Sequence, residues 1–337
     1  TLFKMGGECM KNGIVGSGMI VKVGLDALEK LKENIEKIAI CDRKESLEII
    51  KDLGVKYNIS KIYTDYEELL KDENIDTVYL GIINSMHYEY CKKALESGKN
   101  VICEKPFTSN IRELKELIDL AKSKNLFLFE AITMIYSPNF NYLKNNLNNL
   151  GDIKLVHCNY SQYSSRYDKY LEGTVLPAFD LSMSGGSLYD INIYNIHFVV
   201  GLFGKPNAVK YHANIGFNGI DTSGILILSY DKFTAVCIGA KDSTSVNHAT
   251  VQGIKGYLKV NSSVNISKSI DFYINNELTT FNGELNENHM INEFSAFSEI
   301  IDNKDFETCY KNLRHSEIVM EILCDAKKDA GIIFSAD

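Results

Sequence analysis

The sequence lacks the features that mark nucleic-acid-binding, membrane-spanning and exported proteins. Its 337 residues carry 36 Lys and Arg against 44 Asp and Glu, for a net charge of −8, and the basic residues form no block. A chain without a basic patch has no electrostatic footprint for nucleic acid or an acidic membrane surface. No apolar run approaches the roughly 18 residues that a membrane helix needs, and no signal-peptide core is present. These absences favour a soluble protein, not exported, with a small-molecule partner.

The eight cysteines form no Cys-x-x-Cys pair, and most of them lie in apolar runs. This distribution is typical of reduced thiols in the core of a cytoplasmic protein. His, Cys and Asp residues show no metal-ligand spacing, so we expect no bound metal.

The length and the 45% apolar composition predict two domains, each with its own core. We place the first at residues 10–131 and the second at residues 132–337. Met10 is a natural start for the first strand. Residues 1–9 are equally compatible with an extension outside the fold and with a part of it.

The first domain shows apolar, strand-like runs that alternate with helical patterns. This alternation predicts βαβ crossovers and a doubly wound parallel sheet, as in a Rossmann domain. Thr64 with Glu67, and Asn110 with Glu113, have the spacing of helix-capping boxes, and Gly98 has the position of a helix-ending glycine. The expected strand runs are residues 13–15, 37–41, 77–83, 100–104 and 126–131.

The second domain changes to period-2 stretches separated by Gly, Asn, Ser and Asp. Such stretches are typical of antiparallel strands, so we expect a large, open, mainly antiparallel sheet with helices on one face. A helical insert is expected near residues 189–202, and the helical period returns over residues 290–330. The expected strands are residues 153–160, 224–230, 233–239, 257–260 and 270–274.

A glycine-rich turn after the first strand predicts a dinucleotide site. Gly16, Ser17 and Gly18 open a helix that begins with Met19 and Ile20, and such a turn lets the backbone approach a pyrophosphate at the helix N-terminus. Val21 occupies the third glycine position of this fingerprint, which is expected to widen the packing of helix on strand. An ordinary turn is the alternative interpretation.

Asp42, at the end of the second strand, is placed to accept hydrogen bonds from the adenosine ribose. Its carboxylate disfavours a 2′-phosphate by repulsion, whereas the guanidinium of Arg43 could hold that phosphate or stack on adenine. We therefore expect NAD or NADP as cofactor, with NAD weakly preferred.

Two further segments end strands at the same edge of the expected sheet. Ile83, Asn84 and His87 follow the third strand, where ligands of parallel sheets bind; His87 can equally be a helix-start histidine that bonds the backbone. Glu104 and Lys105 precede Pro106, and an X-Pro bond is the usual home of a cis peptide. This step puts Lys105 where a substrate could meet a cofactor.

In the second domain, Gly185 and Gly186 precede a helix that carries Asp190, Tyr194 and His197 at helical spacing, hence on one face. A glycine pair lets the backbone approach a ligand, and a carboxylate and a phenol one turn apart can bind and titrate a hydroxyl. An amphipathic helix with one polar face would show the same spacing.

Several segments carry a resemblance to a known family: residues 63–70, 76–79 and 94–101, the Glu104-Lys105-Pro106 step and residues 185–194. Through them, nearly the whole chain resembles the glucose-fructose oxidoreductase/inositol dehydrogenase (Gfo/Idh/MocA) family. The resemblance implies a Rossmann domain and an α/β domain whose open sheet often mediates dimers or tetramers. It also implies a nicotinamide cofactor between the domains, with the family lysine at Lys105 and the acid and hydroxyl roles at Asp190 and Tyr194. Tyr194, where inositol dehydrogenases carry histidine, is similar to the sugar and dihydrodiol dehydrogenases.

Two departures from the family leave the substrate open: Ile82 and Ile83 replace a common Thr-Pro, and Ile135 replaces a common arginine.

We expect Tyr194 to be the general acid/base, because a nearby ammonium, that of Lys105, favours its phenolate form. Asp190 is expected to orient a substrate hydroxyl and to balance the lysine. The alternatives are a relative that hydrolyses glycosides through transient oxidation, and a non-catalytic protein that senses dinucleotide or sugar.

Overall fold

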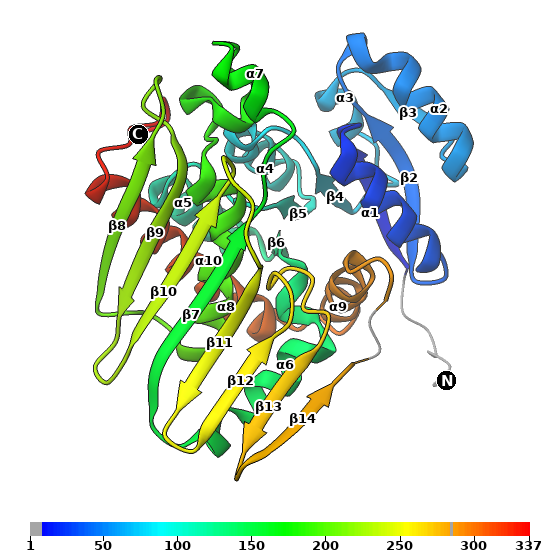
Figure 1. Cartoon of the computed structure of the whole chain (residues 1–337). Helices are drawn as coiled ribbons and strands as arrows, with labels where there is room; N and C mark the ends of the chain where they lie inside the picture. The colour runs from blue at the N-terminus through cyan, green and yellow to red at the C-terminus, as the bar shows by residue number, and fades with distance from the viewer. Residues whose placement is uncertain (1–8, 284–285) are drawn as a thin grey trace. The chain divides into compact units, whose positions relative to one another are not determined.

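The computed structural model describes residues 9–283 and 286–337 (Figure 1), which form two compact units. Unit 1 contains the described part of Thr1–Phe107 with Arg112–Ala131 and Asn286–Arg314. Unit 2 contains Thr108–Ile111, the described part of Ile132–Leu285, and His315–Asp337. Unit 1 thus takes in a segment that the sequence analysis assigned to the second domain. The expectation for residues 1–8 lies outside the described residues, and the first strand does begin at Met10.

Unit 1 is built on a six-stranded sheet in the order β3-β2-β1-β4-β5-β6, and every pairing in it is parallel. This confirms the doubly wound sheet. All residues of β4 and β6 are buried, as expected for strands covered on both faces. The strands are β1 (Met10–Val15), β2 (Ile35–Cys41), β3 (Lys61–Tyr63), β4 (Thr77–Leu80), β5 (Asn100–Glu104) and β6 (Leu128–Ala131).

The helices of unit 1 follow the start and stop signals of the sequence with one correction. The cap of α3 is Asp65, whose side chain accepts from the Glu67 N–H, and not the expected Thr64. Gly98 has the positive φ of a helix-ending glycine. The helices are α1 (Met19–Lys30), α2 (Leu47–Tyr57), α3 (Tyr66–Leu70), α4 (His87–Glu96), α5 (Ile111–Lys124) and α9 (Met290–Asp302), with short turns η1 (Lys44–Ser46) and η2 (Asn84–Met86); α10 (Phe306–Asp329) begins in unit 1 and continues in unit 2.

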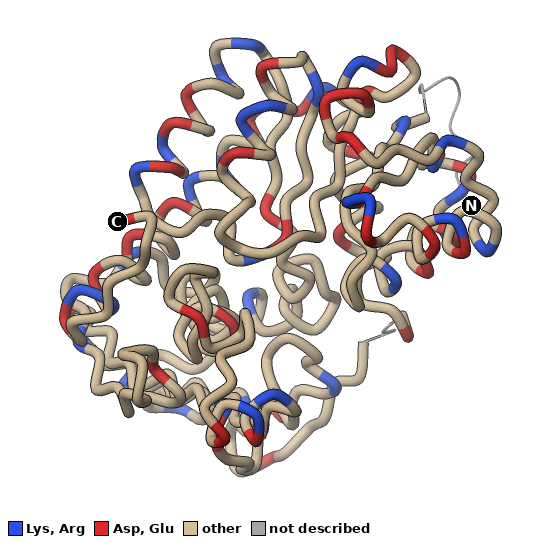
Figure 2. Tube along the Cα trace, turned by 90° about the horizontal axis from the view of Figure 1, so that it is seen from above, with Lys and Arg blue, Asp and Glu red and all other residues tan. Residues whose placement is uncertain are grey.

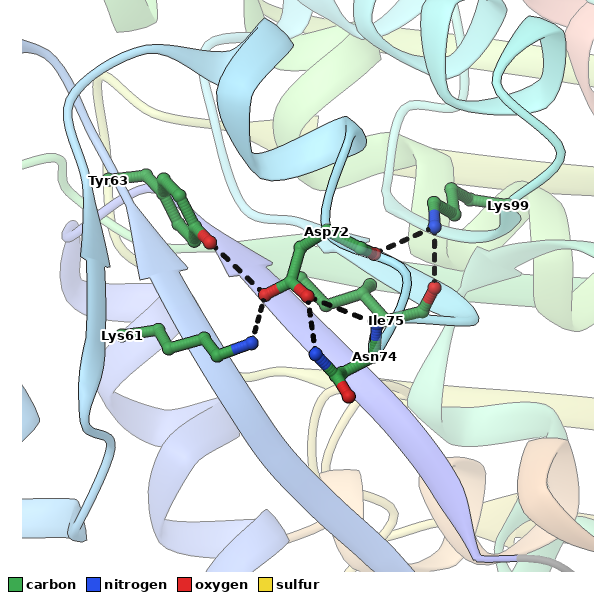
Figure 3. A network of polar contacts seen from close by, with 6 residues as sticks. All are labelled: Lys61, Tyr63, Asp72, Asn74, Ile75 and Lys99. Atoms are coloured by element: carbon green, nitrogen blue, oxygen red, sulfur yellow. Dashed lines mark hydrogen bonds and ion pairs between the residues drawn. The ribbon is translucent and has the colours of Figure 1, made fainter.

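A buried polar network closes the loop between α3 and β4 (Figure 3). The carboxylate of Asp72, 5% exposed, accepts from Lys61 Nζ at 2.6 Å, from the Tyr63 hydroxyl at 3.1 Å and from Asn74. Lys99 donates to the carbonyl oxygens of Asp72 and Ile75. These contacts satisfy the polar groups where β4 and β5 begin, at the edge of the sheet opposite the glycine-rich turn.

Unit 2 is built on an eight-stranded sheet in the order β14-β13-β12-β11-β7-β10-β9-β8. The pairing of β7 with β10 is parallel and the others are antiparallel, which confirms an open, mainly antiparallel sheet. The strands are β7 (Ile153–Ser161), β8 (Ala208–Ile215), β9 (Asp221–Ser229), β10 (Thr234–Ala240), β11 (His248–Gly253), β12 (Gly256–Val260), β13 (Ile270–Ile274) and β14 (Glu277–Phe281).

One face of this sheet is covered by helices, and burial alternates along β9 and β10 accordingly. The expected insert becomes a π-helical turn, η7 (Leu188–Asn192), followed by α8 (Ile193–Phe203), which packs on β7 and β10. The other helices and turns are α6 (Pro138–Asn146), α7 (Tyr167–Leu171), η3 (Thr133–Tyr136), η4 (Leu147–Leu150), η5 (Pro177–Phe179) and η6 (Leu181–Met183).

Basic and acidic residues are interspersed along the trace (Figure 2). Among the residues that the structure describes, no helix is both long enough and apolar enough to cross a bilayer.

Candidate active site

The glycine-rich turn has the geometry of a dinucleotide loop. Gly16 takes φ +108°, and a Cβ there would lie 2.4 Å from the Gly81 carbonyl oxygen, so no larger residue fits. Gly18 is the N-cap of α1 and no side chain caps the helix, so its first N–H groups are available to a ligand. A Cβ on Gly18 would meet nothing within 4 Å, and the side chains of Met19 and Ile20 are 76% and 39% exposed. The residues present fit a pyrophosphate at this helix terminus.

The packing of α1 explains why the fingerprint tolerates Val21. A Cβ on Gly81, just after β4, would lie 2.5 Å from Val21 Cγ2. The absence of a side chain at Gly81 therefore leaves room for Val21 at the end of β4. Whether Val21 widens the packing of helix on strand stays a prediction.

Asp42 lies at the carboxyl end of β2, as the sequence predicted. Its Oδ2 accepts from the Ser17 hydroxyl at 2.5 Å and its Oδ1 accepts from the Arg43 N–H at 2.7 Å. The Arg43 guanidinium is 4.0 Å from Oδ1 and its side chain is 70% exposed, so this ion pair is loose. The turn and the carboxylate are thus held together, which suits a group that binds a ribose beside a pyrophosphate.

His87 connects two loops at the carboxyl edge of the unit 1 sheet. It is fully buried, with Nδ1 2.8 Å from the Pro106 carbonyl oxygen and Nε2 3.2 Å from that of Ile82. Burial lowers the pKa of His87, and the ring nitrogen that carries the proton donates to one of these two carbonyls. His87 thus holds the loops that carry Ile83, Asn84 and the cis Lys105–Pro106 peptide, and it presents no ring nitrogen to a ligand.

Glu104, expected at the cofactor, is also buried in unit 1. Its Oε1 accepts from the Tyr79 hydroxyl at 2.8 Å, and burial raises its pKa to about 7 against the opposing effects of Tyr79 and Lys105. The nearby Glu293 of α9 is fully buried, and burial raises its pKa as well. Glu104 therefore belongs to a core of protonatable groups, while Lys105, the next residue, is half-buried.

The glycine pair of unit 2 is required by close packing within the protein. A Cβ on Gly185 would lie 2.6 Å from the Pro177 carbonyl oxygen, and one on Gly186 would lie 2.2 Å from Asp221 Oδ1. Asp221 Oδ2 accepts from the Leu188 N–H at 2.6 Å, at the first residue of η7. The pair therefore admits a protein carboxylate, and not a ligand, to the start of the turn that carries Asp190. Single π-turns of this kind are frequent at functional sites.

Asp190 has a cationic partner that the sequence analysis missed. Lys241 follows β10 and is 2% exposed, and its Nζ donates to Asp190 Oδ2 at 2.6 Å, while the Asp190 side chain is 39% exposed. The signal was available: like Lys105, Lys241 directly follows an apolar strand.

Tyr194 and His197 have different surroundings, although they share a helix. Tyr194 is half-buried, with its ring centroid 6.0 Å from that of Tyr160 on β7. His197 is fully buried, and its Nδ1 lies 2.9 Å from His315 Nε2. Burial, with the neighbouring His197 and Lys144, lowers the pKa of His315 to about 3. The polar face of unit 2 therefore consists of Asp190 and Tyr194, whereas His197 belongs to the core.

Unit 1 gathers Gly16, Ser17, Gly18 and Asp42 in one bonded loop, and unit 2 gathers Asp190 with Lys241. Across residues 9–283 and 286–337, no group of three His, Cys, Asp or Glu side chains could hold a metal ion. A parallel sheet with an open glycine-rich helix start, followed by a unit with an acid on η7 and a phenol on α8, fits the class of dinucleotide-dependent oxidoreductases.

Comparisons with known proteins lead to the same class. Residues 10–132 match the model of an oxidoreductase family with an NAD-binding Rossmann fold, and residues 146–270 match the GFO/IDH/MocA C-terminal domain. A scyllo-inositol 2-dehydrogenase (NADP(+)) of Bacillus subtilis is 33% identical, over 96% of this chain and 98% of its own. A trans-1,2-dihydrobenzene-1,2-diol dehydrogenase of Xenopus tropicalis is 31% identical, over 75% of this chain and 76% of its own. The chain belongs to the GFO/IDH/MocA oxidoreductase family.

Solved structures share the fold. A levoglucosan dehydrogenase in complex with NADH and levoglucosan superposes with a TM-score of 0.84 at 16% identity, covering 96% of this chain and 98% of its own. A 3-ketoreductase from Actinomadura kijaniata with NADP and TDP-benzene gives 0.83 at 19% identity, covering 95% and 98%.

Proposed function

We propose that the protein moves a hydride between the nicotinamide of NAD or NADP and a hydroxyl-bearing carbon of a sugar, polyol or related diol, with NAD weakly preferred. The observation that carries the proposal is the open, uncapped start of α1 beside Asp42, which fits the pyrophosphate and ribose of such a cofactor. The names of the relatives, which act on an inositol and a dihydrodiol, support the substrate class.

The cofactor supplies the hydride chemistry, and the protein supplies proton transfer and position. We assign the general acid/base role to Tyr194, which takes the proton of the substrate hydroxyl during oxidation. Lys105 favours the phenolate and donates to the same oxygen as charge develops on it. Asp190 binds the reacting or a neighbouring hydroxyl. The support for this assignment is the motif around each residue and the family to which the chain belongs.

The experiment is a turnover screen of sugars, polyols and dihydrodiols with NAD and with NADP, followed by absorbance of the reduced cofactor. On the best substrate, Lys105→Met and Tyr194→Phe should each slow hydride transfer by about two to four orders of magnitude. The dissociation constant for the cofactor should barely change, and the double variant should lose less than the two effects added.

Three outcomes contradict parts of this proposal. If both variants keep full activity, the roles of Lys105 and Tyr194 are wrong. A wild type that binds NAD and a sugar but never turns over favours a sensor. Release of sugar from a glycoside without net reduction of cofactor favours the glycosidase-like reading.

The protein is further proposed to be a cytoplasmic homodimer or homotetramer that acts on a small carbohydrate-like molecule. Its eight cysteines are free, as expected in a reducing compartment. On the sheet face that turns away from Leu226 and Leu228, exposed Leu155 and Ile225 form an apolar surface that a second copy could bury. A monomer in light scattering at micromolar concentration would refute the association.

A further inference from the structure

Lys241 is a buried lysine held from several sides. Its Nζ donates to Asp190 Oδ2 at 2.6 Å and to the Ala178 carbonyl oxygen at 2.9 Å, and it lies 4.7 Å from the ring centroid of Phe179. Its backbone N–H donates to the Thr222 carbonyl, and its own carbonyl accepts from the Ser164 N–H. An ammonium removed from water in this way is stable only when anions and carbonyls surround it.

The burial of this ion pair is one-sided. The lysine side chain is 2% exposed and the aspartate side chain is 39% exposed. A long lysine usually lets its ammonium reach water, and the reverse arrangement occurs in this protein also at Lys37–Glu29 (8% and 45% exposed) and Lys327–Asp337 (5% and 30% exposed). Here the cation is fixed behind the carboxylate, and the carboxylate faces outward.

A second buried carboxylate feels the charge of this cation and holds the turn that carries Asp190. Asp221 is 1% exposed, and it accepts from the Tyr211 hydroxyl at 2.7 Å and from the Leu188 N–H at 2.6 Å. Burial raises the pKa of Asp221, while these hydrogen bonds and the charge of Lys241 oppose the shift. Lys241 therefore contacts Asp190 directly and also stabilises the carboxylate that anchors the start of η7.

We infer that Lys241 is a positioning residue for the proposed oxidoreductase reaction: it keeps Asp190 ionised and aimed at the substrate hydroxyl. This inference rests on the proposed function, and it adds a residue to which neither the motifs nor the family resemblance assigned a role. Lys241 touches neither substrate nor cofactor in this assignment, because its side chain is 2% exposed and its Nζ donates to Asp190 and Ala178.

The test compares Lys241→Met, Lys241→Gln and Lys241→Arg with Asp190→Asn and with the double variant Lys241→Met/Asp190→Asn. Lys61→Met is the matched control, because it removes a lysine from an ion pair of equal length in unit 1. Lys241→Met should lower kcat/KM about tenfold to a hundredfold, the usual cost of a misplaced reacting group, with NAD affinity unchanged. Arginine should restore part of the rate, and the double variant should be no slower than Asp190→Asn alone.

The pH profile separates positioning from packing. Lys241→Gln removes the buried cation but keeps a hydrogen-bond donor and the approximate length of the side chain. In this variant, the acidic limb of the pH profile of kcat/KM should move to higher pH. Asp221, Tyr211, Asp242 and Tyr194 are the other titratable groups around the pair, and they are unchanged in every variant. Lys61→Met should leave the limb in place.

A loss of thermal stability in Lys241→Gln with unchanged kcat/KM and pH profile would overturn the inference. If the wild type turns over no substrate, the proposed function fails, and the pairing is then judged by 13C NMR titration of labelled aspartates. The Asp190 signal is identified by its absence in Asp190→Asn. Its midpoint should be higher in Lys241→Gln than in the wild type, and equal midpoints would overturn the inference with or without turnover.

Discussion

The protein contains two lysine–aspartate pairs of equal length and opposite exposure. In the network of Figure 3, Lys61 is 38% exposed and Asp72 is 5% exposed; in unit 2, Lys241 is 2% exposed and Asp190 is 39% exposed. Both pairs have an N–O distance of 2.6 Å. Distance alone therefore does not separate a structural pair from a functional one. Exposure separates them only together with a motif: Lys327 and Asp337 are also 5% and 30% exposed, but Asp190 lies in a family motif, where an exposed carboxylate held by a buried cation can bind a hydroxyl.

The largest effect expected from this contrast is on catalysis. Asp190→Asn should lower kcat/KM by about 10² to 10³, the usual cost of removing one preorganised polar group from a reacting centre. Because the change leaves the Lys241 ammonium buried without its carboxylate, the unfolding midpoint should fall as well. Steady-state kinetics and urea unfolding of the same preparation measure both quantities. A variant with normal kinetics and lower stability would make Asp190 a structural residue like Asp72.

The next largest effect should appear in the other pair and on stability alone. Asp72→Asn should lower the free energy of unfolding by about 2 to 3 kcal/mol, less than a fully buried pair would lose, because Lys61 can regain water. Burial by itself would raise the pKa of Asp72, but the bonds from Lys61, Asn74 and Tyr63 outweigh it and hold the pKa well below its usual range. Urea unfolding measures the loss, and a change in kcat larger than twofold would contradict the assignment.

The sequence predicts the first unit well because its signals are local. Apolar runs alternating with helical periods indicated the parallel sheet, and glycine spacing indicated the cofactor turn. Strands β3, β8, β11 and β14 were missed. Strand β3 has only three residues, the residues of β14 are nearly all exposed and only Tyr211 is buried in β8, so these three show no alternation that a pattern could detect. Strand β11 does alternate, with Ala249 and Val251 buried, but the sequence analysis did not assign it.

The sequence predicts site residues only where it carries motifs. Lys105, Asp190 and Tyr194 were predicted because each lies in a recognisable motif, and their roles stay predictions. Lys241 was missed because it lies 51 residues from Asp190 and reaches it only through the register of β10 in the sheet. The contact of Val21 with Gly81 was missed for the same reason, since only the fold brings α1 against the end of β4.

The loss of stability in acid should distinguish the buried histidine pair, His197 with His315, from both lysine–aspartate pairs. The pKa of His315 is lowered from 6.5 to about 3, so the unfolded chain takes up a proton more readily than the folded one. Stability from this pair is therefore fully present above pH 6.5 and falls as the pH drops toward 3, by on the order of 1 kcal/mol between pH 7 and pH 5. The stability that Asp72 contributes should be lost only below about pH 4, the usual pKa of an aspartate. Unfolding free energies at pH 7 and pH 5 test this, and His315→Gln should flatten the difference; an equal slope in both proteins would exclude the histidine pair as its cause.

The smallest effect is expected at the loosest charge pair, Arg43 with Asp42. The guanidinium is 70% exposed and 4.0 Å from the carboxylate, so solvent screens it, while Asp42 is 16% exposed and fixed by Ser17. The fixed carboxylate should repel a 2′-phosphate more than the mobile guanidinium attracts it, which is the basis of the proposed weak preference for NAD. Asp42→Ser should shift the ratio of NAD to NADP dissociation constants toward NADP by about three- to fivefold, less than about 1 kcal/mol. Arg43→Gln is the control and should shift the ratio toward NAD. Fluorescence titration with both cofactors measures the ratio. A wild type that clearly prefers NADP would show that Arg43 dominates, and Asp42→Ser would then change little.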